Sequence, residues 1–274
     1  MADARGFAPA KVNLSLHVTG QRDDGLHLLD SLVAFADVGD HLTISPATAS
    51  TLCVDGPMAA GVPQDARNLV LKAAAWMGET AAFTLEKHLP AAAGIGGGSS
   101  DAAAALRLLA DLTGRPIPHG SEALGADVPV CLAPKATRMR GIGEALAPVA
   151  LPPLPAVLVN PGVEVPTGAV FSALPTKENP PMPADLPRLS NPVQAADWLA
   201  SQRNDLEAPA IAFAPVIGTL LDVLKAQPKL CLARMSGSGA TCFGLFETQS
   251  AAENAANKIR AAFPAWWVVA TKLG

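Results

Sequence analysis

Hydrophobic and polar residues alternate regularly near the start of the chain. Between residues 11 and 18 each polar side chain is followed by an apolar one. A period of two is typical of a β-strand with one buried face. The pattern therefore predicts a strand over 7–20, with Lys11 and Asn13 together on its polar face. That face borders either water or a cleft.

Apolar runs, helical spacing and turn residues divide the rest of the chain. Strands are predicted over 27–38, 41–45 (after a turn at Gly39-Asp40), 81–90, 121–133, 138–149 (a hairpin), 231–247 (two strands around a glycine turn) and 266–274. Helices are predicted over 68–77, 100–112, 193–203, 207–225 and 250–263. Strands and helices mix without a regular βα repeat, which favours an α+β fold.

Prolines mark the expected domain organisation. The stretch ALPPLP at 150–155 predicts a boundary, with one domain over 1–150 and a second over 151–274. The segment 175–192 holds six prolines in 18 residues and is predicted to be an irregular loop. The chain is thus expected to fold as two domains.

Composition and charge narrow the classes of function. Half of the residues are hydrophobic and 16% are charged, which is typical of a globular protein. A net charge of −4 without a basic block argues against nucleic-acid binding, and no apolar run is long enough to span a membrane. Four widely spaced cysteines predict free thiols in a reducing cytoplasm. The sequence has no close Cys/His cluster, so it does not predict a zinc site.

Residues 90–101, PAAAGIGGGSSD, carry four glycines just before an alanine-rich helical segment. Such a loop brings backbone N–H groups and a helix N-terminus to one point, which suits a phosphate group. Its spelling is neither that of a P-loop nor that of a dinucleotide-binding loop, because no lysine precedes Ser99 and position 99 is not glycine. A flexible strand–helix turn explains the glycines about equally well on their own.

Three stretches resemble the motifs of the GHMP small-molecule kinases: PAKVNLSLHV the first, GIGGGSSDAAAAL the second and SGSGATCFGLF the third. DGLH, GADVPVCL, GIGE and RNDLE resemble a cytidyl-binding subfamily of the non-mevalonate isoprenoid (terpenoid) pathway. The resemblance implies a two-domain GHMP-kinase fold with an active-site cleft between the domains. It also implies a transferase that uses ATP and Mg²⁺ to phosphorylate the 2-hydroxyl of a cytidyl diphosphate sugar alcohol.

The resemblance assigns the chemistry to a few positions. Lys11 is implied as the catalytic lysine, and Asp127 as the base that takes the proton from the attacking hydroxyl. An exposed strand lysine and a turn-capping aspartate are the alternatives. The loop implied to bind ATP comprises Pro90, Ala91, Ala92, Ala93, Gly94, Ile95, Gly96, Gly97, Gly98, Ser99 and Ser100.

The substrate side is implied in the same way. Asn13 is expected to contact the sugar alcohol, His27 to read the cytosine and Phe171 to stack on it. Position 26 is leucine where the family commonly has tyrosine, so half of an aromatic sandwich is missing. Asn204 and Asp205 are expected to be structural.

Other functions remain alternatives. One is another GHMP kinase, of the homoserine or mevalonate type, against which DGLH, Phe171 and RNDLE argue. A second is a nucleotide-binding protein without catalysis, or a nucleic-acid module on the same N-terminal fold. Lys11, Asp127 and the acidic net charge argue against both. We expect a monomer or a weak homodimer.

Overall fold

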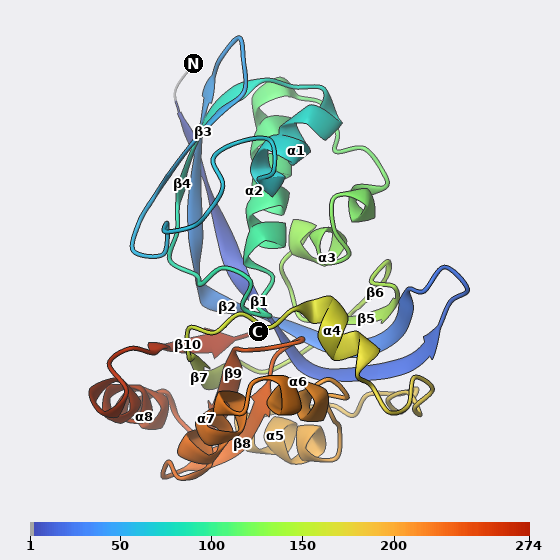
Figure 1. Ribbon diagram of the computed structural model, residues 1–274, viewed down its shortest axis with the longest axis vertical. Coiled ribbons are helices and arrows are strands. Elements are labelled where there is room, and N and C mark those ends of the chain that lie inside the picture. The colour runs from blue at the N-terminus through green and yellow to red at the C-terminus, as the bar shows by residue number, and fades with distance from the viewer. Residues whose placement is uncertain (1–2) are drawn as a thin grey trace. The chain divides into compact units, whose positions relative to one another are not determined.

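The computed structural model describes residues 3–274, and Figure 1 traces them in order. Contacts group these residues into two compact units. The first unit comprises residues 3–11, 38–91 and 96–134, and the second comprises 12–37, 92–95 and 135–274. Two long strands, β1 (Ala4–Gln21) and β2 (His27–Pro46), contribute to both units. The domain boundary at residue 150 stays a prediction.

The first unit places helices against a small sheet. The end of β2 pairs antiparallel with β4 (Ala81–Glu86), and β4 pairs parallel with β3 (Thr51–Asp55). Helices α1 (Leu69–Met77) and α2 (Gly97–Thr113) lie side by side, and α3 (Val128–Leu132) packs on α2 (Figure 1). The short 3-10 helix η1 (Ser121–Ala123) precedes α3.

Local signals fix the helices of this unit. The Asn68 side chain accepts a hydrogen bond from the N–H of Val70 and caps α1, the helix predicted over 68–77. Left-handed Gly114 ends α2. A continuous buried stretch, Ser100–Leu106, shows why this alanine-rich helix forms the centre of the unit.

The second unit is a sheet of antiparallel strand pairs backed by helices. The remaining strands are β5 (Thr137–Gly141), β6 (Ala145–Pro148), β7 (Leu154–Asn160), β8 (Leu230–Met235), β9 (Cys242–Phe246) and β10 (Trp267–Leu273). Their order from β2 is β10, β7, β9 and β8, and the β5–β6 hairpin pairs with β2. The helices are α4 (Thr167–Ser172), α5 (Pro192–Ala200), α6 (Glu207–Phe213), α7 (Val216–Lys225) and α8 (Gln249–Ala262). The α+β class is confirmed.

The turn predicted at Gly39-Asp40 is wrong. Strand β2 runs unbroken through both residues. A Cβ atom at position 39 would collide with the backbone carbonyl of Ala8, so the glycine serves the close approach of two strands. Asp40 is fully buried and paired with a lysine, which removes the usual reason for an aspartate to lie in a turn.

Two further predictions are corrected. Residues 121–133 form η1 and α3, not a strand, because Pro129 in the first turn suits a helix start and the apolar run is too short to distinguish the two. The single helix predicted over 207–225 is two helices, broken at Ala214-Pro215, since proline cannot continue the hydrogen bonding of α6. Among residues 3–274, no helix has both the length and the apolar character that crossing a membrane requires.

Candidate functional site

The glycine-rich loop joins β4 to the N-terminus of α2, as the sequence predicts. Gly94 and Gly96 have φ angles of +73° and +63°, in the left-handed region that favours glycine. Gly96 is the N-cap of α2, and this residue provides no side-chain capping hydrogen bond. The first N–H groups of a helix have no intrahelical partner, so this end suits an anion.

Neighbouring atoms leave little room at the two left-handed glycines. Within the second unit, a Cβ atom on Gly94 would lie 2.6 Å from the carbonyl oxygen of Ser236. Within the first unit, a Cβ atom on Gly96 would lie 3.1 Å from Cβ of Lys11 and 3.9 Å from Oδ2 of Asp127. The backbone of the loop therefore comes as close to its neighbours as glycine alone allows.

Lys11 and Asp127 form an ion pair in the first unit. Strand β1 carries Lys11, and Asp127 precedes the first turn of α3. The Nζ atom of Lys11 donates to Oδ2 of Asp127 at 2.8 Å. The Lys11 side chain is 4% exposed and that of Asp127 is 31% exposed, so the carboxylate is the accessible member. The structure thus brings together two residues that lie 116 positions apart.

Asn13 is buried and its side chain is engaged. Its Nδ2 donates to Oγ of Ser31 at 2.8 Å, and its backbone N–H donates to Oγ of Ser236 at 3.0 Å. Ser236 begins the glycine turn between β8 and β9. Asn204 holds the same turn by donating to the carbonyls of Met235 and Gly237, which confirms its structural role.

The proline-rich segment 175–192 covers the polar face of β1 at Ser15 and His17. At these two residues the face borders neither water nor an open cleft. The hydroxyl of Ser15 lies 3.1 Å from Sδ of Met182, and Nδ1 of His17 lies 3.2 Å from the carbonyl of Pro180. Burial lowers the pKa of His17, and the Arg203 charge adds to the shift. Residues 175–191 have no regular secondary structure, as the prolines predict, and Pro192 begins α5.

His27 and Phe171 lie together in the second unit, with their rings stacked at a centroid distance of 4.6 Å. This contact leaves no gap for another ring between them. The Nε2 atom of His27 is buried and has no hydrogen-bond partner among the described residues. Burial and the nearby Lys177 charge lower the pKa of His27, so the ring is neutral at pH 7. Leu26 beside it is 47% exposed.

Sequence reasoning missed two buried ion clusters. In the first unit, Lys87 contacts both Asp40 and Asp101. In the second unit, Arg138 binds Asp30 through two nitrogens and also donates to carbonyls of the proline-rich segment. The partners are too far apart in the sequence for a local pattern to match them. Their burial, which would mark them as paired, is known only from the fold.

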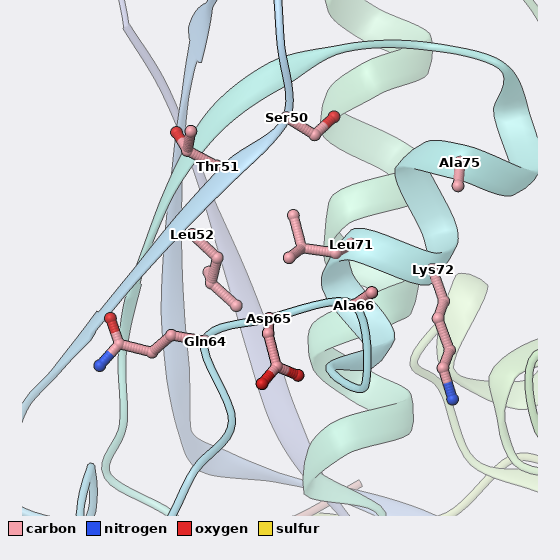
Figure 2. A pocket seen from close by; sticks show the side chains of 9 residues that line it. All are labelled: Ser50, Thr51, Leu52, Gln64, Asp65, Ala66, Leu71, Lys72 and Ala75. Carbon is pink, nitrogen blue, oxygen red and sulfur yellow. The ribbon is translucent and has the colours of Figure 1, made fainter.

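A pocket of about 620 Å³ lies in the first unit between β3 and α1, and Figure 2 shows its lining. Leu52 and Leu71 approach each other across it, and Asp65, Gln64 and Lys72 lie at its margin. Asp65 is already paired with Arg67, which holds the pKa of that carboxyl at about 2. None of the predicted site residues lines this pocket.

Comparisons with known proteins agree on one family. The model of the GHMP kinases N terminal domain matches residues 67–133, and that of the GHMP kinases C terminal matches 188–265. A 4-diphosphocytidyl-2-C-methyl-D-erythritol kinase of Dinoroseobacter shibae is 66% identical over 98% of this chain and 94% of its own length. The enzyme of the same name from Cereibacter sphaeroides strain ATCC 17025 is 57% identical over 96% of both chains.

Solved structures give the same picture. A crystal structure of 4-(cytidine 5'-diphospho)-2C-methyl-D-erythritol kinase matches with a TM-score of 0.77 and 36% identity, covering 99% of both chains. A homoserine kinase from Cytophaga hutchinsonii matches with a TM-score of 0.65 and 18% identity, covering 99% of this chain and 95% of its own. The second likeness concerns the fold alone.

Proposed function

This chain belongs to the GHMP kinase family, and on that premise we propose that it is a 4-diphosphocytidyl-2-C-methyl-D-erythritol kinase. It transfers the γ-phosphoryl group of ATP to the 2-hydroxyl of the methylerythritol unit, a step in the non-mevalonate formation of isoprenoid precursors. Relatives with this name match nearly the whole chain. The single observation that carries the catalytic assignment is the 2.8 Å pair of Lys11 and Asp127 beside the glycine loop.

Asp127 is the general base in this proposal. Its partly exposed carboxylate accepts the proton of the substrate hydroxyl while the hydroxyl oxygen attacks the γ-phosphorus. The bond from the γ-phosphorus to the bridging oxygen breaks, and ADP leaves. Lys11 stabilises the negative charge on the transferring group. Phosphoryl transfer needs positioning and charge stabilisation more than covalent chemistry, so a base, a cation and a phosphate cradle suffice.

The loop Pro90–Ser100 binds the triphosphate of ATP. Its fit rests on the left-handed glycines and on the uncapped N-terminus of α2. Mg²⁺ enters as part of the substrate, bound to the phosphates, and neutralises their charge. Among residues 3–274 no group of three His, Cys, Asp or Glu side chains gathers as a separate metal site.

The cytosine binds at the pair of His27 and Phe171. Because the two rings are in contact, the base enters between them only when the His27 ring turns away from Phe171. The unpartnered Nε2 atom of His27 then has a hydrogen-bonding edge of the base within reach. Asn13 contributes to the sugar-alcohol end. The cleft between the domains, the cytoplasmic location and a monomer or weak homodimer stay predictions from the sequence.

The test is a coupled assay of ADP release with a panel of alcohol acceptors. We expect turnover with the cytidyl substrate and none above background with homoserine or mevalonate. Lys72→Ala is a matched control for Lys11→Met, since Lys72 is an exposed lysine outside the predicted site. Turnover with another acceptor would favour a different GHMP kinase, and ATP binding without any turnover would favour a silent nucleotide-binding protein.

A further inference from the structure

A buried ion cluster lies in the first unit behind the start of α2. Lys87 follows β4, Asp40 belongs to β2 and Asp101 belongs to the first turns of α2. The Nζ atom of Lys87 donates to Oδ2 of Asp101 at 2.9 Å and also contacts Oδ2 of Asp40. All three side chains are at most 4% exposed. We call these three residues the Lys87 cluster.

The cluster is attached to both ends of the glycine loop. The Oδ1 atom of Asp40 accepts hydrogen bonds from the backbone N–H groups of His88 and Leu89, at 2.6 and 2.9 Å, just before the loop begins. Asp101 lies in α2, just after the loop ends. A Cβ atom on Gly97 would lie 3.6 Å from Nζ of Lys87, so the ammonium directly adjoins the helix N-terminus.

The charges of the cluster do not balance when all three groups are ionised, because two carboxylates share one ammonium. Burying a surplus charge is costly, and a buried carboxylate beside another one gives way by taking a proton. The Oδ1 atom of Asp101 is buried and has no hydrogen-bond partner among the described residues. Burial raises the pKa of Asp101 to about 7, the Asp40 charge adds to this and the Lys87 charge opposes it.

Among the described residues, the charges that act on Asp101 are those of Lys87 and Asp40. Arg107 on the same helix donates to the backbone carbonyls of Cys131 and Phe7. The only titratable side chain of α3 is Cys131, and burial raises the pKa of its thiol to about 12, so it is uncharged. The only one of α1 is Lys72, which is exposed. Lys11 on β1 is paired with Asp127.

We propose that the Lys87 cluster positions the glycine loop for the phosphates, and that Asp101 takes up a proton when the phosphates bind. This inference rests on the proposed function, in which the triphosphate lies on the loop. Negative charge arriving at the helix N-terminus disfavours a second ionised carboxylate behind it. The proton leaves the cluster with no surplus negative charge that would repel the phosphates. Asp101 is a positioning residue and does not touch the reacting atoms.

The test is the linkage between ATP binding and protons. Calorimetric titrations of Mg²⁺–ATP at pH 7, in two buffers of different ionisation enthalpy, give the number of protons taken up. We expect the wild-type protein to take up more protons than Asp101→Asn. Its affinity should fall with rising pH above 7, by at most about tenfold for each pKa unit that binding adds to Asp101. Asp111→Asn, on an exposed position of the same helix, should behave like wild type.

The outcomes separate the two proposals. Protons released by ATP itself are the same for each protein, so the difference between variants isolates Asp101. Equal uptake by wild type and Asp101→Asn would overturn the inference while leaving the proposed function intact. Failure of the wild-type protein to bind ATP would overturn the proposed function, and this inference with it.

A second measurement avoids substitution altogether. The carboxyl carbon of Asp101, followed by NMR in the unmodified protein, should titrate near pH 7 and at higher pH with ATP bound. Ionisation complete by pH 5, with or without ATP, would overturn the inference even if Asp101→Asn fails to fold.

Unfolding gives a further readout of the same proton. The native state holds this proton above the ordinary pKa of an aspartate, so stability should fall as pH rises from about 4 to about 7 and then level off. The melting temperature of Asp101→Asn should decrease less between pH 4 and pH 7 than that of the wild-type protein. A parallel decline in both proteins would argue against proton uptake at this residue.

Discussion

Two regions of the molecule, the phosphate end and the base end of the proposed site, are held by different forces. At the phosphate end, the partly exposed pair of Lys11 and Asp127, the buried pair of Lys87 and Asp101 and left-handed glycines surround the start of α2. At the base end, His27 and Phe171 are held by ring stacking, and Leu26 beside them is 47% exposed. Ring pairs contribute about 0.5–1.5 kcal/mol beyond burial.

The largest effect is expected where charge does the chemistry. Asp127→Asn should lower kcat by about 10²–10⁴-fold, because general-base assistance typically contributes that much. The Kd for ATP should hardly change, since in the proposed site the loop and not Asp127 binds the phosphates. Steady-state kinetics and ATP titration measure the two quantities, with Asp111→Asn as the control. A kcat within a few-fold of wild type would contradict the assignment of Asp127 as the general base.

The next effect concerns the space at the loop. Gly96→Ala should raise the KM for ATP at least about tenfold, because the new Cβ meets Lys11 and alters the start of α2. Gly114→Ala is the matched control: it has a similar left-handed φ of +70° at the other end of α2, with nothing within 4 Å of its Cβ position. Both variants should lose about 1–2 kcal/mol of stability, because each places a side chain in the left-handed region. Equal KM values for ATP in Gly96→Ala and Gly114→Ala would contradict the proposal that the loop binds the phosphates.

The smallest effect belongs to the base end. Leu26→Tyr should lower the KM for the cytidyl substrate by about two- to twelve-fold, the equivalent of one added ring contact. The kcat should stay nearly constant, because contact with a remote base stabilises substrate and transition state alike. Leu146→Tyr, at an exposed leucine on β6, controls for adding a ring elsewhere. A rise in KM would mean that another side chain already fills the stacking position.

The sequence predicts the local parts of this fold well. Alternation identifies β1, the Asn68 cap identifies α1, and the glycines locate the start of α2, because each signal acts within a few residues. The family resemblance assigns Lys11 and Asp127 to the same reaction, which no local pattern contains, and the structure pairs them. Other features depend on close packing between distant residues. Gly39 is predicted to lie in a turn, and only the fold shows that it allows Ala8 to approach.

Buried ion pairs between residues far apart in the sequence could not be predicted from local patterns. Asp40 and Asp101 look like ordinary turn and helix-start residues, and only the fold places both on Lys87. Arg138 likewise resembles a surface arginine in a hairpin until the proline-rich segment covers it. Residues 128–132 are helical because Pro129 and the packing on α2 outweigh their apolar character.

The most direct test of the account is single-turnover phosphorylation of the cytidyl substrate by Asp127→Asn, Lys11→Met and the double variant. Groups that act as a unit give non-additive losses. We predict that each single variant loses about 10²–10⁴-fold in rate and that the double variant is little slower than either. Strictly multiplicative losses in the double variant would contradict the claim that the 2.8 Å pair of Lys11 and Asp127 works as one catalytic unit.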